Sequence, residues 1–135
     1  MKRIASAVVT STARNYRQHI ATGDFELAAD EPVAAGGQNA GPGPYNLLLA
    51  SLGACTSITL KMYADRKGWD IGAIKVVLTL SRDPSGNTHI DRSLDVDAPL
   101  TAEQWDKLLD IAAKTPVTRT LSAGVQIMTT RAVAA

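Results

Sequence analysis

The chain has 135 residues, of which 45% are hydrophobic and 20% are charged, a composition that suits one globular domain over residues 1–135. The 14 basic and 13 acidic residues give a formal net charge of +1. This balance argues against a nucleic-acid partner or an anionic membrane surface, because both require a concentrated positive field.

Short strands are expected in the first third of the chain. Residues 4–10 are rich in small and β-branched side chains, and residues 16–21 alternate loosely between polar and apolar side chains. Gly23-Asp24 marks a turn before a third strand at residues 25–29. Together these segments predict a small antiparallel meander.

A long helix is expected after a glycine- and proline-rich loop at residues 31–43. Pro44 suits the first turn of a helix because its missing N–H costs nothing there, and Gly68 is a natural stop. Apolar residues recur on almost every side of residues 44–67, which predicts a helix buried on most of its circumference. The apolar stretch at residues 45–54 is too short to span a bilayer, so no membrane partner is expected.

A β-hairpin follows the helix. Within residues 71–81, every second residue is apolar at Ile74, Val76, Leu78 and Leu80, with Lys75 and Thr79 on the opposite face. Residues 83–87 have the composition of a turn, and residues 88–96 form the second arm. Thr101 and Gln104 then form a capping-box pattern at the start of a second helix.

The last part of the chain predicts a helix end and one more strand. Thr115-Pro116 either ends the second helix or begins a further short one, with Thr115 as N-cap and Pro116 as the first helical residue. Residues 125–129 are expected to form a final strand. This order of elements predicts an α+β fold with mostly antiparallel sheet, because the βαβ alternation of a doubly wound sheet is absent.

Cys55, the single cysteine, lies among small residues near the middle of the apolar helix. A lone cysteine in such surroundings is usually an inert core residue. A catalytic role needs a nearby cation, because the thiolate is the nucleophile, and the available arginines are Arg14, Arg17 and Arg119. A catalytic Cys55 should therefore lie near a cavity and a guanidinium, whereas an inert one should lie in dry packing.

Other chemistry finds less support in the sequence. His19 and His89 could serve as the base of a thiol hydrolase, but their polar neighbours favour surface positions. No cluster of Asp, Glu or His has metal-ligand spacing, so no metal or cofactor is expected. One cysteine cannot form a disulfide within the chain, and the first residues lack the apolar run of a signal peptide, so a cytoplasmic location is expected.

Four segments carry a resemblance: ADEP at residues 29–32, GPGPYNLLLASLGACT at 41–56, MYADRKGW at 62–69, and KTPVTRTL at 114–121. In this order and at these spacings they resemble the OsmC/organic hydroperoxide resistance family. The resemblance implies an OsmC-like fold, with mostly antiparallel sheets around a long buried central helix. It also implies an intertwined homodimer with the central helices at the subunit interface.

In that family a peroxidatic cysteine attacks a hydroperoxide, and the resulting sulfenic acid condenses with a second cysteine, which a thiol reductant or lipoyl partner then reduces. Cys55 matches the first cysteine, but Thr115 stands where the second is expected, so a sulfenate cannot be resolved within the chain. Asn46 stands where active members commonly carry a glutamate that pairs with a catalytic arginine, and asparagine cannot form that ion pair. Arg14 and Arg17 are the candidates for the arginine.

Two functions remain open. The first is a one-cysteine thiol peroxidase of the oxidative-stress response. In this case Cys55 would reduce an organic hydroperoxide, more readily an apolar one than hydrogen peroxide, and an external thiol reductant would resolve the sulfenate. The alternative is a non-catalytic scaffold or a protein that binds a small apolar ligand, in which Cys55 is a small core side chain.

Overall fold

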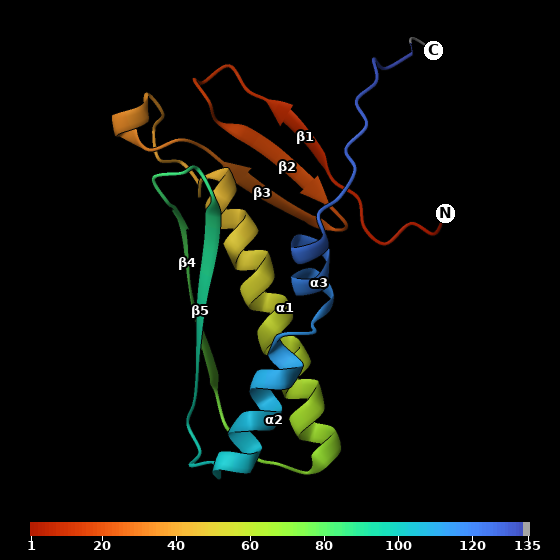
Figure 1. Cartoon of the computed structure of the whole chain (residues 1–135). Coiled ribbons are helices and arrows are strands. Elements are labelled where there is room, and N and C mark those ends of the chain that lie inside the picture. The colour runs from red at the N-terminus through yellow and green to blue at the C-terminus, as the bar shows by residue number, and fades with distance from the viewer. Residues whose placement is uncertain (134–135) are drawn as a thin grey trace. The chain divides into compact units, whose positions relative to one another are not determined.

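The computed structural model describes residues 1–133, in which two antiparallel sheets and three α-helices form the α+β fold that the sequence predicts (Figure 1). The chain divides into two compact units, and the boundary between Ala50 and Ser51 lies inside the long helix α1 (Pro44–Lys67). The assignment of residues 1–135 to one domain stays a prediction. Each unit is therefore described by itself.

The first unit is a three-stranded meander with strand order β1-β2-β3. Its elements are β1 (Val8–Ser11), β2 (Gln18–Thr22), β3 (Phe25–Ala29) and a 3-10 turn (Val33–Ala35). The first strand begins later than the expected residue 4, because Val8 already pairs with Ala21 near the end of β2. The second begins after Tyr16, whose φ of 64° is incompatible with a strand.

The buried carboxylate of Asp30 organises the loop between β3 and α1. It accepts hydrogen bonds from the backbone N–H groups of Glu31 at 2.8 Å, Gln38 at 3.2 Å and Ala40 at 3.0 Å. These hydrogen bonds, that from Ala40 first, hold the pKa of Asp30 below its ordinary value, although burial acts in the opposite direction. The loop is thus held by an ionised side chain rather than by apolar packing.

Helix α1 has the limits that the sequence predicts. Gly68 adopts a φ of 70°, and the N–H of Trp69 donates to the carbonyl of Ala64 at 2.9 Å, which closes the last turn. Only one stripe of the helix is buried, at Leu52, Thr56, Leu60 and Ala64. The prediction of burial on most of the circumference is therefore wrong for the single chain, because residues four apart present only one face.

The exposed side of α1 remains apolar. Ile58 and Met62, four residues apart, are 55% and 59% exposed. By length and apolar composition the whole helix of 24 residues, a longer segment than the stretch at residues 45–54, could cross a membrane. Core helices of globular proteins pass the same test, and the buried stripe packs against protein.

The second unit contains β4 (Ile74–Arg82), β5 (Thr88–Val96), α2 (Ala102–Ala112) and α3 (Pro116–Ala123). The two strands form the predicted hairpin, which Figure 1 shows alongside α1, and their burial alternates so that one face packs inward. The core of the unit is Leu60, Ala64, Ile71, Leu108 and Ala112. Ile71 therefore belongs to the core, and the strand begins after Gly72, whose φ is 70°.

Helices α2 and α3 both begin at positions that the sequence predicts. The capping box at Thr101 is present, with hydrogen bonds in both directions between Thr101 and Gln104. Thr115 and Pro116 begin α3, which confirms the second of the two alternatives. The strand expected at residues 125–129 is absent. Its residues are exposed, because among the described residues of this unit only β4 and β5 pair.

We predict that Asp30→Asn lowers the melting temperature most at neutral pH. The pKa of Asp30 is lower in the folded protein than in the unfolded chain, where it is near 3.8. The contribution of Asp30 to the free energy of unfolding is therefore complete above pH 3.8 and is lost as the pH falls through the folded-state pKa. Melting curves between pH 3 and pH 7 should show a gap between the two proteins that narrows toward acid. Asp24→Asn, in the exposed turn after β2, is the control. A gap independent of pH would contradict this account.

Candidate functional site

Cys55 lies half-buried on the part of α1 that belongs to the second unit, next to the fully buried Thr56. The helix approaches the hairpin closely at this turn, since a Cβ on Gly53 would lie 2.8 Å from Cδ1 of Leu78 on β4. In the hairpin register Leu78 pairs with Arg92. Arg92 therefore projects from β5 toward the same turn of α1.

Three neutral oxygen atoms hold the guanidinium of Arg92. Its Nη1 donates to Thr56 Oγ1 at 2.9 Å and to Thr118 Oγ1 at 2.8 Å, and its Nη2 donates to the carbonyl oxygen of Ala112 at 2.8 Å. Thr56 Oγ1 in turn donates to the carbonyl of Leu52 at 2.7 Å. One side chain thus joins α1, the end of α2 and α3.

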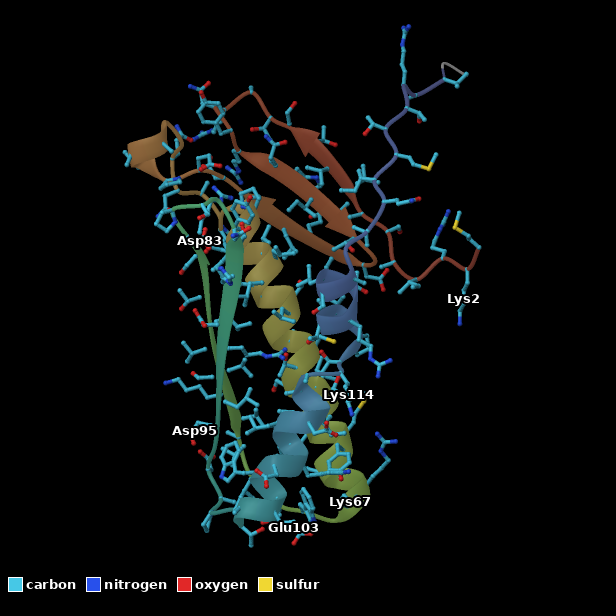
Figure 2. The ribbon with its side chains drawn as sticks, viewed as in Figure 1. Lys2, Lys67, Asp83, Asp95, Glu103 and Lys114 are labelled. Atoms are coloured by element: carbon cyan, nitrogen blue, oxygen red, sulfur yellow. The ribbon has the colours of Figure 1, made fainter. Side chains whose placement is uncertain are left out.

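The charge of Arg92 has no carboxylate partner in the part of the chain that the structure describes. Within residues 1–133, no carboxylate oxygen lies within ion-pair distance of this guanidinium. On the hairpin, Asp83 lies near the turn and Asp95 lies near the open end of the two strands (Figure 2). Burial lowers the pKa of Arg92, and the negative charge of the Cys55 thiolate acts in the opposite direction. Since an arginine stays protonated in proteins, the site presents a positive charge to Cys55.

Sequence reasoning missed Arg92, although a signal was present. The inward face of β5 carries Ile90, Leu94 and Val96 at alternating positions. Position 92 belongs to the same series, so an arginine there must face the core side of the hairpin. A charged residue at an apolar-face position is rarely buried without a role, because its desolvation is unfavourable.

The arginines chosen from the sequence lie elsewhere. Arg14 and Arg17 belong to the first unit, where Arg14 Nη1 donates to Gln38 Oε1 at 3.4 Å and the charge of Arg17 helps to lower the pKa of Asp30. Their role at Cys55 stays a prediction. Arg119 is exposed on α3.

Thr115, at the position of the expected second cysteine, is fully buried. Its Oγ1 lies 2.6 Å from Oγ1 of Thr118, the same oxygen that accepts from Arg92. The hydroxyl at this position therefore belongs to the hydrogen-bond network that holds the arginine. Asn46 is exposed near the start of α1, in the first unit.

The two histidines lie on the surface, each beside a carboxylate. His19 is 3.4 Å from Glu26, and His89 is 3.3 Å from Asp83 in the hairpin turn. Both side chains are about half exposed or more, so neither is placed as the buried base that a hydrolase would need. No group of three His, Cys, Asp or Glu that could hold a metal ion occurs among the described residues.

A pocket of about 460 Å³ opens beside Arg92. Besides the arginine, its lining consists of three apolar residues, Leu52, Ile90 and Leu121, and three hydroxyl residues, Thr88, Thr118 and Ser122. A partly apolar pocket and a guanidinium that no carboxylate of residues 1–133 neutralises thus lie together beside this turn of α1. Cys55, whose charge acts on Arg92, is not among the residues that line the pocket. Such a pocket can receive an apolar molecule that carries a polar or charged group.

Comparison with known proteins identifies the family. A sequence model described as "OsmC-like protein" matches residues 36–130, which is most of the chain. The chain belongs to the OsmC-like family. The match includes Cys55, Arg92 and Thr115, so the whole site of the second unit lies inside the family's region. A comparison with curated protein sequences finds no match.

Solved structures share the fold of this OsmC-like chain. A putative osmotic stress induced and detoxification response protein from Psychrobacter arcticus 273-4 has 18% identity and a TM-score of 0.76, over 89% of this chain and 90% of that one. An OsmC like protein from Mycoplasma pneumoniae has 20% identity and a TM-score of 0.76, over 90% and 89%. The organic hydroperoxide resistance protein OhrB of Bacillus subtilis has 24% identity and a TM-score of 0.60, over 87% and 90%.

Proposed function

We propose that this OsmC-like chain is a one-cysteine thiol peroxidase that reduces organic hydroperoxides in the oxidative-stress response. The observation that carries the proposal is the guanidinium of Arg92, which meets no carboxylate among residues 1–133 and lies close enough to Cys55 for the charges of the two groups to interact. A nearby cation favours the thiolate, which is the nucleophile in peroxide reduction. Family membership supports the same role, since one relative with this fold is described as an organic hydroperoxide resistance protein.

The proposed reaction begins at the sulfur of Cys55. The thiolate attacks one peroxide oxygen, a sulfur–oxygen bond forms as the oxygen–oxygen bond breaks, and the sulfur loses two electrons. The alkoxide that leaves takes up a proton and becomes an alcohol. An external thiol then condenses with the sulfenic acid, forming a mixed disulfide and releasing water. A second external thiol attacks this disulfide, so that Cys55 leaves as a thiolate and the external thiols become a disulfide.

The external thiol is needed because the chain carries no second cysteine. At the position where a second cysteine is expected, Thr115 has a different role. Its hydroxyl contacts that of Thr118, which accepts a hydrogen bond from Arg92. The alternative function, a non-catalytic scaffold or apolar-ligand protein, draws support from the apolar side of the pocket. A purely apolar ligand would make no use of the charge of Arg92, whereas the peroxidase would use it at Cys55.

We also propose that the chain forms a homodimer in the cytoplasm. The support for the dimer is the exposed apolar side of α1 at Ile58 and Met62, which water does not favour and which a second copy of the same helix would cover. The support for the location is the single cysteine, whose thiol must stay reduced for the proposed reaction.

If the chain is a peroxidase, an apolar alkyl hydroperoxide such as cumene hydroperoxide should oxidise Cys55 rapidly, and hydrogen peroxide should oxidise it more slowly. Stopped-flow consumption of each peroxide by the reduced protein, with dithiothreitol for turnover, measures both rates. Trapping with dimedone should label Cys55 as a sulfenic acid by mass spectrometry. Cys55→Ser should consume neither peroxide.

A gain-of-function variant sharpens this test. Thr115→Cys supplies a thiol at the position of the expected second cysteine, so peroxide should convert Cys55 to an intramolecular disulfide in place of the dimedone adduct. Peroxide consumption no faster in the native protein than in Cys55→Ser would exclude the peroxidase and leave the scaffold.

If the exposed side of α1 forms the dimer interface, Ile58→Asp should shift the protein from dimer to monomer in sedimentation velocity. The side chain is more than half exposed in the single chain, so the aspartate should be tolerated by the fold and disfavoured only at an interface. Lys107→Asp, on the exposed side of α2, adds the same carboxylate and should leave the mass unchanged. A native protein that sediments as a monomer at micromolar concentration would refute the dimer.

A further inference from the structure

Arg92 retains hydrogen-bond donors that its network does not use. A guanidinium has five N–H donors, and those of Arg92 meet the oxygens of Thr56, Thr118 and Ala112. The two donors of Nη1 are both occupied, and Nη2 uses one. One Nη2–H and the Nε–H have no hydrogen-bond partner among residues 1–133 of the chain.

The positions of the acceptors show which edge of the guanidinium is free. Thr118 Oγ1 and the carbonyl oxygen of Ala112 lie only 3.4 Å apart, and they accept from Nη1 and Nη2 respectively. They therefore lie together along the edge formed by Nη1 and Nη2. The remaining donors form the Nε–Nη2 edge, where two parallel N–H groups make the fork that binds a planar carboxylate.

The pocket next to this arginine suits the rest of such a ligand. Its apolar lining is Leu52, Ile90 and Leu121, and its volume of about 460 Å³ falls within the usual range for small-molecule sites. The other polar lining groups are neutral hydroxyls. One cation with neutral hydroxyls matches a single negative charge better than the double charge of a phosphate.

We propose that the free edge of Arg92 binds the carboxylate of a small apolar acid, whose hydrocarbon part packs against Leu52, Ile90 and Leu121 in this pocket. The ligand class is therefore an amphipathic monocarboxylate. The proposal goes beyond the peroxidase and does not require it, because the recognition uses Arg92 and the pocket and makes no use of the sulfur of Cys55.

The test uses the full-length Cys55→Ser protein, which has no thiol, so its outcome does not depend on whether Cys55 is catalytic. Isothermal titration calorimetry with octanoate below its micellar concentration should detect one binding site per chain. Octan-1-ol keeps the tail and loses the charge, and acetate keeps the charge and loses the tail. Both should bind at least about tenfold more weakly than octanoate, a difference of about 1.4 kcal/mol.

Substitutions at the site test the guanidinium edge and the pocket wall one at a time. Arg92→Lys keeps the charge and loses the two-pronged edge, so octanoate affinity should fall about tenfold. Leu121→Asp places a carboxylate on a partly exposed wall of the pocket and should abolish binding without unfolding the protein. Arg82→Met removes an exposed arginine from the same hairpin and should leave the affinity unchanged.

Three results would overturn the proposal. Octanol that binds as tightly as octanoate would show an apolar pocket without carboxylate recognition. Octanoate affinity unaffected by both Arg92→Lys and Leu121→Asp would place the acid elsewhere. No detectable octanoate binding at millimolar concentration would exclude the site in the protein as it exists in solution.

Discussion

The site depends on one interaction, the attachment of the Arg92 guanidinium to three neutral oxygens on three different helical segments. The hydrogen bonds to Thr56, Thr118 and the carbonyl of Ala112 fix the side chain without cancelling its charge. A carboxylate of the chain in their place would have neutralised the arginine permanently, whereas the neutral oxygens leave its charge available to Cys55 or to an acidic ligand. The arginine is therefore preorganised beside Cys55 without an ion pair to the chain. The negative charge of Cys55 favours the protonated form of this arginine.

Thr115 links this interaction to the proposed chemistry. A cysteine there could resolve a sulfenic acid, whereas the threonine hydroxyl hydrogen-bonds to Thr118, which accepts from Arg92. One such hydrogen bond contributes about 1 kcal/mol, and a buried acceptor left without its donor costs more. The absence of a second thiol and the placement of the arginine are thus two consequences of the same residue, and both agree with a one-cysteine reaction.

Local signals in the sequence predicted much of the fold. Pro44 and Gly68 act on the backbone at their own positions, and the capping box at Thr101 joins residues three apart, so all three predictions were confirmed. Features that depend on contacts between residues far apart in the sequence were not predicted. The strand expected at residues 125–129 needs a partner strand that composition does not reveal. Apolar residues around α1 indicate that the helix avoids water, but not whether its own chain covers it. Arg92 was not predicted, because the alternation along β5 indicates which face of the strand it lies on but not that α1 lies across that face with Cys55 beside Thr56.

The rate at which iodoacetamide alkylates Cys55 at pH 7 reports whether the charge of Arg92 acts on the thiol, because only the thiolate reacts. Arg92→Met should slow the reaction about threefold to tenfold, as expected when a nearby charge worth about 1 kcal/mol is removed. Arg92→Lys should react at an intermediate rate, and Arg82→Met, which removes an exposed arginine of the same hairpin, should react as the native protein does. Circular dichroism of each variant checks that the fold is kept. A folded Arg92→Met protein that is alkylated as fast as the native one would contradict the account.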